Sequence, residues 1–171
     1  HDEMFTLPIK NGPSDADIIN RSLADDFDSE KFLRKIAECY RKAPYYQLVF
    51  PVIEDIVNYP DQNLFRFLFH SIERLMAYLG ISTRLVISST LQVPRALKGQ
   101  ERVMATCRAI GATSYLNPIG GIELYDKATF GNCGISLGFL KSKSVIYEQF
   151  DNDFVPFLSI LDIMMFNPVA T

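Results

Sequence analysis

Residues 99–116, GQERVMATCRAIGATSYL, decide the expected fold class of this chain. Their first part, Gly99 to Ile110, has the pattern of a helix that ends at Gly111, and Thr113 to Leu116 has the pattern of a short strand. A buried strand is expected before them, from Arg84 to Ser88. The order of strand, helix and strand predicts a right-handed βαβ crossover and therefore a parallel sheet.

The rest of the chain adds further elements on both sides of this unit. Apolar residues at helical spacing, with Asn63 as an N-cap and Gly80 as a stop, predict the clearest helix between them. The other expected helices are one that follows Ser29 and ends at Pro44, Tyr46 to Val57 with Pro51 inside it, Lys127 to Asn132, and Leu158 to Phe166; the other expected strands are Phe5 to Ile9, Asp17 to Asn20, and Ile135 to Phe139. We therefore expect an α/β fold with a small, largely parallel sheet flanked by helices, forming a single domain over residues 1–171.

Composition excludes several classes of protein. The chain is 48% apolar and 22% charged, as ordinary globular proteins are. A formal net charge of −3 provides no general basic field for neutralising phosphates, so nucleic-acid binding is not expected, although a local basic patch stays open. No apolar run approaches the ~20 residues of a membrane helix. A charge-mixed face made of Lys98, Glu101, Arg102 and Arg108 is interpreted as solvated, with anion binding as the alternative.

The cysteines and the first residues bear on location. Cys39, Cys107 and Cys133 are odd in number and form no C-x-x-C pair, which favours reduced thiols in a cytoplasmic protein. The start, HDEMF, has no signal-peptide pattern and no initiator methionine, so we expect residues to be missing upstream.

Candidate binding residues gather where the predicted strands end. The turn 117–121, Asn-Pro-Ile-Gly-Gly, follows one strand, and Ser88 and Ser89 end the other. Because ligands of open α/β sheets bind at the carboxyl ends of neighbouring strands, these segments predict a cleft for an anionic substrate; tight-turn glycines and turn-capping serines are the alternative. The residues proposed for this cleft are Ser88, Ser89, Tyr115, Asn117, Gly120, Gly121 and Tyr125.

Asp162 is a further candidate, because apolar neighbours in SILDIM are expected to bury it. A buried carboxylate requires a hydrogen-bond partner, so we expect one. An Asp that faces the positive end of a helix is the main interpretation, and an acid/base role is the alternative. No metal site is expected, since His1 and His70 are the only histidines and His70 is interpreted as a packed or surface residue of its helix. The sequence assigns no catalytic residue and no cofactor.

Several segments in their order resemble the WbqC-like protein family of bacteria over nearly the whole chain. The segments that carry the resemblance are Leu7 to Ile9, Tyr40 to Tyr46, Val49 to Pro51, Tyr78 to Thr83, Cys107 to Leu116, and Leu158 to Asp162. The resemblance implies that an N-terminal family segment is absent here. It also implies a role in gene clusters for O-antigen and other surface polysaccharides, where a transferase activity is suspected.

Three functions follow from the resemblance. The first is an enzyme that transfers an acyl, aminoacyl or other activated group to a sugar nucleotide. The second is a non-catalytic scaffold of glycan assembly, for which the aromatic residues Tyr45, Tyr46, Phe65 and Phe69 would form an exposed apolar patch. The third is nucleotide binding without transfer. The expected partners are a sugar nucleotide or an activated donor, with no nucleic acid; the oligomeric state is not predicted.

Overall fold

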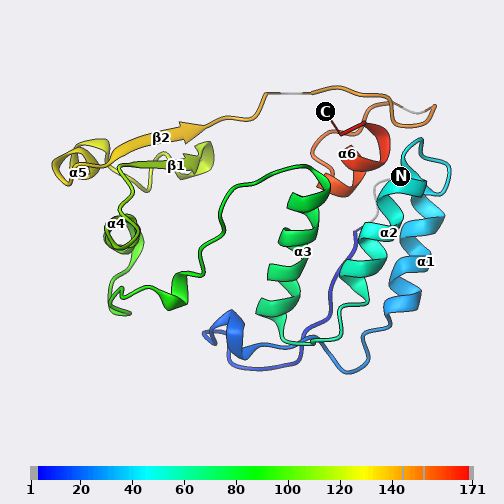
Figure 1. The fold of residues 1–171 in the computed structure, drawn as a ribbon, viewed down its shortest axis with the longest axis horizontal. Helices are drawn as coiled ribbons and strands as arrows, with labels where there is room; N and C mark the ends of the chain where they lie inside the picture. The colour runs from blue at the N-terminus through cyan, green and yellow to red at the C-terminus, as the bar shows by residue number, and fades with distance from the viewer. Residues whose placement is uncertain (1–3, 144, 152, 170–171) are drawn as a thin grey trace. The chain divides into compact units, whose positions relative to one another are not determined.

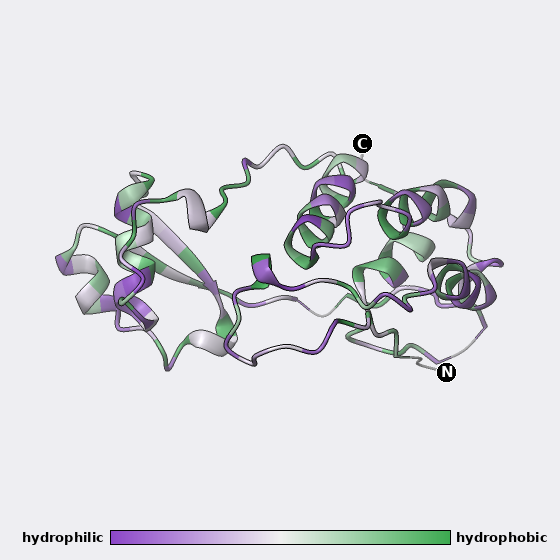
Figure 2. Ribbon diagram, turned by 90° about the horizontal axis from the view of Figure 1, so that it is seen from below, coloured by the Kyte–Doolittle hydropathy of each residue, from purple (hydrophilic) through white to green (hydrophobic). Residues whose placement is uncertain are grey.

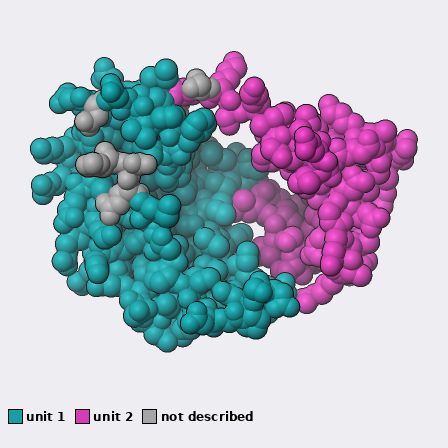
Figure 3. Space-filling model, turned by 180° about the vertical axis from the view of Figure 1, so that it is seen from behind, with its two compact units in different colours: residues 1–83, 146–171 teal, residues 84–145 magenta. Residues whose placement is uncertain are grey.

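The computed structural model describes residues 4–143, 145–151 and 153–169. The chain divides into two compact units, coloured separately in Figure 3. Unit 1 consists of residues 1–83 and 146–171, and unit 2 of residues 84–145.

Unit 1 is helical. Its elements are η1 (Ile18–Asn20), α1 (Ser29–Tyr40), α2 (Tyr46–Val57), α3 (Leu64–Tyr78) and α6 (Ile160–Phe166). Helix α2 contacts α1, α3 and α6, and Figure 1 shows α1, α2 and α3 lying alongside one another. Hydrophilic and hydrophobic residues alternate around these helices in Figure 2, as expected for helices that pack on one side.

Side-chain caps fix where these helices begin. The side chain of Asp28 accepts a hydrogen bond from the Lys31 amide, and that of Asn63 accepts one from the Arg66 amide. Asn63 is therefore the N-cap that its sequence predicts, whereas Ser29, expected to precede the first helix, is instead the first residue of α1. Helix α3 ends before Gly80, whose φ of 66° suits glycine and closes the helix as predicted.

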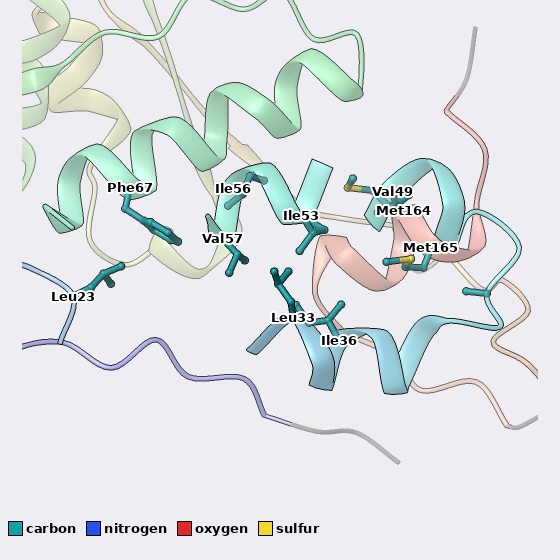
Figure 4. Close-up of a cluster of buried hydrophobic side chains, with 11 residues drawn as sticks. Leu23, Leu33, Ile36, Val49, Ile53, Ile56, Val57, Phe67, Met164 and Met165 are labelled. Atoms are coloured by element: carbon teal, nitrogen blue, oxygen red, sulfur yellow. The ribbon is translucent and has the colours of Figure 1, made fainter. Parts of the chain in front are cut away.

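The core of unit 1 lies between these helices, as Figure 4 shows. Its buried residues are Leu23, Leu33, Ile36, Ala43, Val49, Ile53, Ile56, Val57, Phe67, Met164 and Met165. Helix α2 contributes more of them than any other element. Burial of each large side chain contributes about 1.5–3 kcal/mol, so this cluster is the main source of stability in the unit.

Unit 2 contains the sheet. Its elements are η2 (Ser88–Thr90), α4 (Gly99–Ala109), β1 (Ser114–Pro118), η3 (Ile119–Gly121), α5 (Lys127–Asn132) and β2 (Ser136–Leu140). Strands β1 and β2 pair in parallel, with Ser114 opposite Ser136 and Pro118 opposite Leu140. A second buried cluster, made of Met104, Cys107, Phe130, Ile135 and Leu137, packs α4 and α5 against β2. The predicted α/β class with a small parallel sheet is confirmed.

The order of the strands differs from the prediction. The segment from Arg84 to Ser88 forms no strand, and Ser88 begins a 3-10 turn instead. The side chains of Leu85 and Val86 are exposed, so their apolar run does not mark a buried strand. Strand β1 therefore pairs with β2 across the connection that contains α5, and the expected crossover through α4 is wrong.

The N-terminal strands are also fewer than expected. Phe5 to Ile9 contributes a single antiparallel bridge, between Ile9 and Leu23. Asp17 to Asn20 is not a strand, because Ile18–Asn20 form the 3-10 turn η1. Pro8 has no amide hydrogen to donate to a ladder, which accounts for the short pairing. That residues 1–171 form one domain stays a prediction.

None of the helices in the described part of the chain combines the length and the apolar character that crossing a bilayer requires.

Candidate functional site

A cavity of about 450 Å³ lies within unit 1. It is bounded by the N-terminal segment, by helices α1, α2 and α3, and by the C-terminal part of the chain from Gln149 to Phe166. This volume falls in the range of small-molecule binding sites. The cavity is therefore our candidate functional site.

Most of the cavity wall is apolar. Representative side chains are Phe32 and Ile36 from α1, Ile53 from α2, and Phe67 and Leu75 from α3. Several of them also belong to the unit 1 core, so the cavity is continuous with that core. Such a wall favours the apolar part of a ligand.

The carboxylate of Asp162 is a charged group in this mostly apolar wall. It is 4% exposed and lies in the first turn of α6. The Tyr147 hydroxyl donates to its Oδ1 at 2.6 Å, the Gln149 Nε2 donates to the same oxygen at 2.8 Å, and the Tyr40 hydroxyl donates to its Oδ2 at 3.1 Å. The predicted burial and the predicted hydrogen-bond partner of Asp162 are confirmed.

Both phenols stay protonated around this carboxylate. Burial, followed by the charge of Asp162, raises the pKa of Tyr40 far above its ordinary value. Burial, followed by the hydrogen bond to Asp162, raises the pKa of Tyr147 to about 12. At neutral pH the two hydroxyls are therefore hydrogen-bond donors that hold the carboxylate in place.

Gln149 links this carboxylate to the segment beside the cavity. Its side chain is 6% exposed and, besides donating to Asp162, donates to the Val155 carbonyl at 3.1 Å and accepts from the Val155 amide at 2.7 Å. The ring of Phe150 packs edge-on against Phe166, with ring centroids 4.7 Å apart. The Gln149 side chain thus ties its own position to Val155 and orients Asp162.

Tyr40, Tyr147 and Gln149 are functional candidates that the sequence analysis missed. Tyr40 has the helical spacing of an apolar core residue, and it lies 122 residues from Asp162 in sequence. Tyr147 and Gln149 lie in a segment without regular secondary structure. No local pattern joins the three, since only the fold brings them to one carboxylate.

His70 lies outside this site. It is half-buried in α3 and stacks on Tyr59, with ring centroids 4.2 Å apart. Its Nε2 lies 3.3 Å from Asp55 Oδ2 without forming a hydrogen bond, and Arg74 Nε pairs with the same oxygen at 2.6 Å. Within the described residues there is no group of three His, Cys, Asp or Glu side chains arranged to hold a metal.

Unit 2 brings four of the predicted binding residues together. The Tyr115 hydroxyl donates to Asn117 Oδ1 at 2.9 Å, and the rings of Tyr115 and Tyr125 lie 6.0 Å apart, edge to face. Gly121 is buried against the Asn117 amide and the Tyr125 ring, so a Cβ at this position would require the Asn117 side chain to move. Close packing therefore accounts for the glycine at 121, whereas a turn that only glycine can adopt does not, because neither Gly120 nor Gly121 has a positive φ.

The other predicted residues make no side-chain hydrogen bond with this group in the described part of the structure. Ser88 and Ser89 are exposed in η2, and the strand that was to bring them beside Asn117 is absent. Gly120 is exposed, with open space where a Cβ would be. Asp162 belongs to unit 1, whereas the other candidates belong to unit 2.

The two units differ strongly in charge. Unit 2 contains eight lysines and arginines and three aspartates and glutamates, a net charge of +5. Unit 1 contains nine and seventeen, respectively, a net charge of −8 with histidine neutral. The overall charge of −3 conceals this asymmetry, which favours anions at unit 2 and cations at unit 1.

Comparison with known proteins gives a family and no individual relative. No curated protein and no solved structure matches the chain. A model of the WbqC-like protein family matches residues 1–171. Because this match covers every residue of the sequence, the chain belongs to the WbqC-like protein family.

Proposed function

We propose that this protein acts in the biosynthesis of bacterial surface polysaccharides, as a transferase that moves an acyl or aminoacyl group onto a sugar nucleotide. Family membership is consistent with a protein of polysaccharide gene clusters. The observation that carries the transferase proposal is the 450 Å³ cavity with one held carboxylate in an apolar wall. An apolar wall suits the hydrocarbon part of an acyl group better than it suits a sugar or a phosphate.

In the proposed reaction a hydroxyl or amino group of the sugar attacks the carbonyl carbon of the activated donor. A new ester or amide bond forms, the bond to the leaving group breaks, and the proton of the nucleophile passes to the leaving group or to solvent. The cavity residues would position the acyl part and exclude water from it. Unit 2, taken by itself, carries a net charge of +5, which suits an anionic ligand.

The test is a thermal-shift screen of the full chain against acyl and aminoacyl donors, sugar nucleotides and nucleotides. Ligand at ~100 Kd stabilises a one-site protein by about 2.7 kcal/mol, which moves the midpoint by several degrees. We expect shifts with donors and with sugar nucleotides. A response to nucleotides alone would favour nucleotide binding without transfer, and no response to any compound would refute the proposal.

A matched pair of variants tests whether donors bind in the cavity. Ser71 in α3 lines the cavity, so Ser71→Trp should fill it and abolish the response to donors. Ala77→Trp changes an exposed position of the same helix and should leave the response intact. Equal responses from the two variants would place donor binding outside the cavity.

An interaction module is the second candidate, because helix α3 carries an apolar stripe. Phe65, Leu68, Phe69 and Ile72 follow helical spacing, and Leu68 and Ile72 are 37% and 46% exposed. Two of the predicted patch residues, Phe65 and Phe69, belong to this stripe, and their rings are 5.8 Å apart. Sedimentation of the full chain and of Ile72→Lys tests this second candidate. Self-association of the full chain that is lost in Ile72→Lys would favour the interaction module.

A further inference from the structure

The charges that face the cavity restrict its ligand more narrowly than its apolar wall does. Among the described residues that line it, only Asp153 and Asp162 are charged, and no lysine, arginine or histidine is present. An anion would therefore enter an apolar space beside carboxylates, with no cation to balance it. A free carboxylate or a phosphate group is accordingly a poor ligand for this space.

Asp162 has capacity for one further donor. An ionised carboxylate offers about four acceptor positions. Its Oδ1 accepts from Tyr147 and Gln149. Among the residues that the structure describes, only Tyr40 donates to its Oδ2, at the longer distance of 3.1 Å. A ligand N–H group can therefore bind Oδ2 without displacing a protein donor.

Aromatic rings surround this carboxylate. Phe166 lies one helical turn after Asp162 on α6, and its ring contacts Tyr40, Tyr147 and Phe150 at centroid distances of 6.2, 6.4 and 4.7 Å. Tyr40, Phe150 and Phe166 all line the cavity. Aromatic faces together with a carboxylate are the combination that binds organic ammonium ions.

We propose that the cavity selects an apolar group that carries an ammonium ion, and therefore that the transferred group is aminoacyl rather than plain acyl. This inference rests on the proposed function. The apolar side chain of the aminoacyl group occupies the space between α1, α2 and α3. Its α-ammonium group donates to Asp162 Oδ2 and lies against the rings of Tyr40 and Phe166.

The test compares three probes that share one carbon skeleton. Leucinamide carries an ammonium group, 4-methylpentanamide lacks it, and 4-methylpentanoate carries a negative charge in place of the neutral amide. Their affinities for the full chain are measured by ligand-observed NMR or calorimetry at neutral pH. We expect leucinamide to bind about 10- to 100-fold more tightly than 4-methylpentanamide, the range for a hydrogen bond to a charged group, and 4-methylpentanoate to bind most weakly.

Two carboxylate variants assign the preference. Asp162→Asn should bring the affinities of leucinamide and 4-methylpentanamide within about threefold, whereas Asp153→Asn should keep the preference. The comparison of probes in the unmodified chain needs neither variant, so it stands even if Asp162→Asn fails to fold. Loss of the preference in Asp153→Asn alone would overturn the assignment to Asp162.

The outcomes separate this inference from the function on which it rests. Equal binding of leucinamide and 4-methylpentanamide, abolished by Ser71→Trp, would overturn the ammonium inference and keep the cavity as an acyl site. If 4-methylpentanoate bound most tightly of the three probes, the cavity would prefer a negative charge, and the inference would be overturned. Absence of binding by all three probes would overturn both proposals.

Discussion

Replacing Gln149 by Met should destabilise unit 1 by several kcal/mol. Methionine keeps the length and approximate volume of glutamine but makes none of its three hydrogen bonds, two with the Val155 backbone and one with Asp162. A bond to a neutral group contributes about 0.5–1.5 kcal/mol and a bond to a charged group about 1.5–3 kcal/mol. The expected loss is therefore about 2.5–6 kcal/mol, a large fraction of the roughly 5–15 kcal/mol that stabilises a typical domain.

The assay is urea unfolding, followed by far-UV circular dichroism and by tyrosine fluorescence, since the chain contains no tryptophan. Gln47→Met is the matched control, because Gln47 is exposed on α2, and it should change the free energy of unfolding by less than about 0.5 kcal/mol. Gln149→Glu should cost more than Gln149→Met, since it places a second carboxylate where the Gln149 amide nitrogen is 2.8 Å from Asp162. A loss below about 1 kcal/mol in Gln149→Met would refute the view that this side chain holds the site together.

Three further predictions concern single positions. The pKa of Tyr147 is raised to about 12 from an ordinary value of 10.0, so its contribution to stability is complete below pH 10 and is lost as the pH rises toward 12. Across this range the free energy of unfolding should fall more steeply with pH in the native chain than in Tyr147→Phe. Equal slopes of the two proteins would contradict the raised pKa. Gly121→Ala should destabilise the protein by about 1–3 kcal/mol, because the new Cβ would meet the Asn117 amide and the Tyr125 ring. Gly120→Ala should be near neutral, because a Cβ at that position meets open space. Thermal unfolding compares the two variants, and equal effects would contradict the close packing at Gly121. Phe157 is fully exposed and has a φ of 61°, a backbone conformation that asparagine tolerates better than phenylalanine. Phe157→Asn should therefore relieve about 1 kcal/mol of backbone strain and raise the midpoint of thermal unfolding. A lowered midpoint would indicate that the phenylalanine ring contributes a contact.

The helices could be predicted from sequence because their signals are local. Asn63 as a cap, Gly80 as a stop and the apolar spacing between them all act within one or two turns, and they placed α3 correctly. The bounds predicted for the short helix Lys127–Asn132 are also confirmed.

The sheet was harder to predict, because an apolar run does not specify its partner. Arg84 to Ser88 and Ser136 to Leu140 both have strand-like composition, yet only the second pairs with β1. Burial decides between them: Leu137 is buried with Phe130 and Ile135, whereas Leu85 and Val86 are exposed. Tertiary packing overrides local propensity at such positions.

The candidate site was predictable at one residue only. Asp162 could be identified because apolar neighbours bury it and an isolated buried carboxylate is unfavourable, so a partner had to exist. The identity of that partner depends on residues far away in sequence. Tyr40 in particular had the spacing of a core residue, and its hydroxyl is used only after α6 packs against α2.

The arrangement of unit 1 in two separate stretches, 1–83 and 146–171, sets an order for its assembly on the ribosome. Unit 2 lies between these stretches in the sequence, so all of its residues are synthesised while unit 1 still lacks α6. Tyr40 precedes Asp162 by 122 residues, which corresponds to a delay of roughly 6–25 seconds at ordinary elongation rates. During this delay the apolar faces of α1 and α2 lack Met164 and Met165. The nascent chain therefore depends on α6 to complete the core that α1 and α2 begin, and the interval before that completion is when chaperone binding would protect it most.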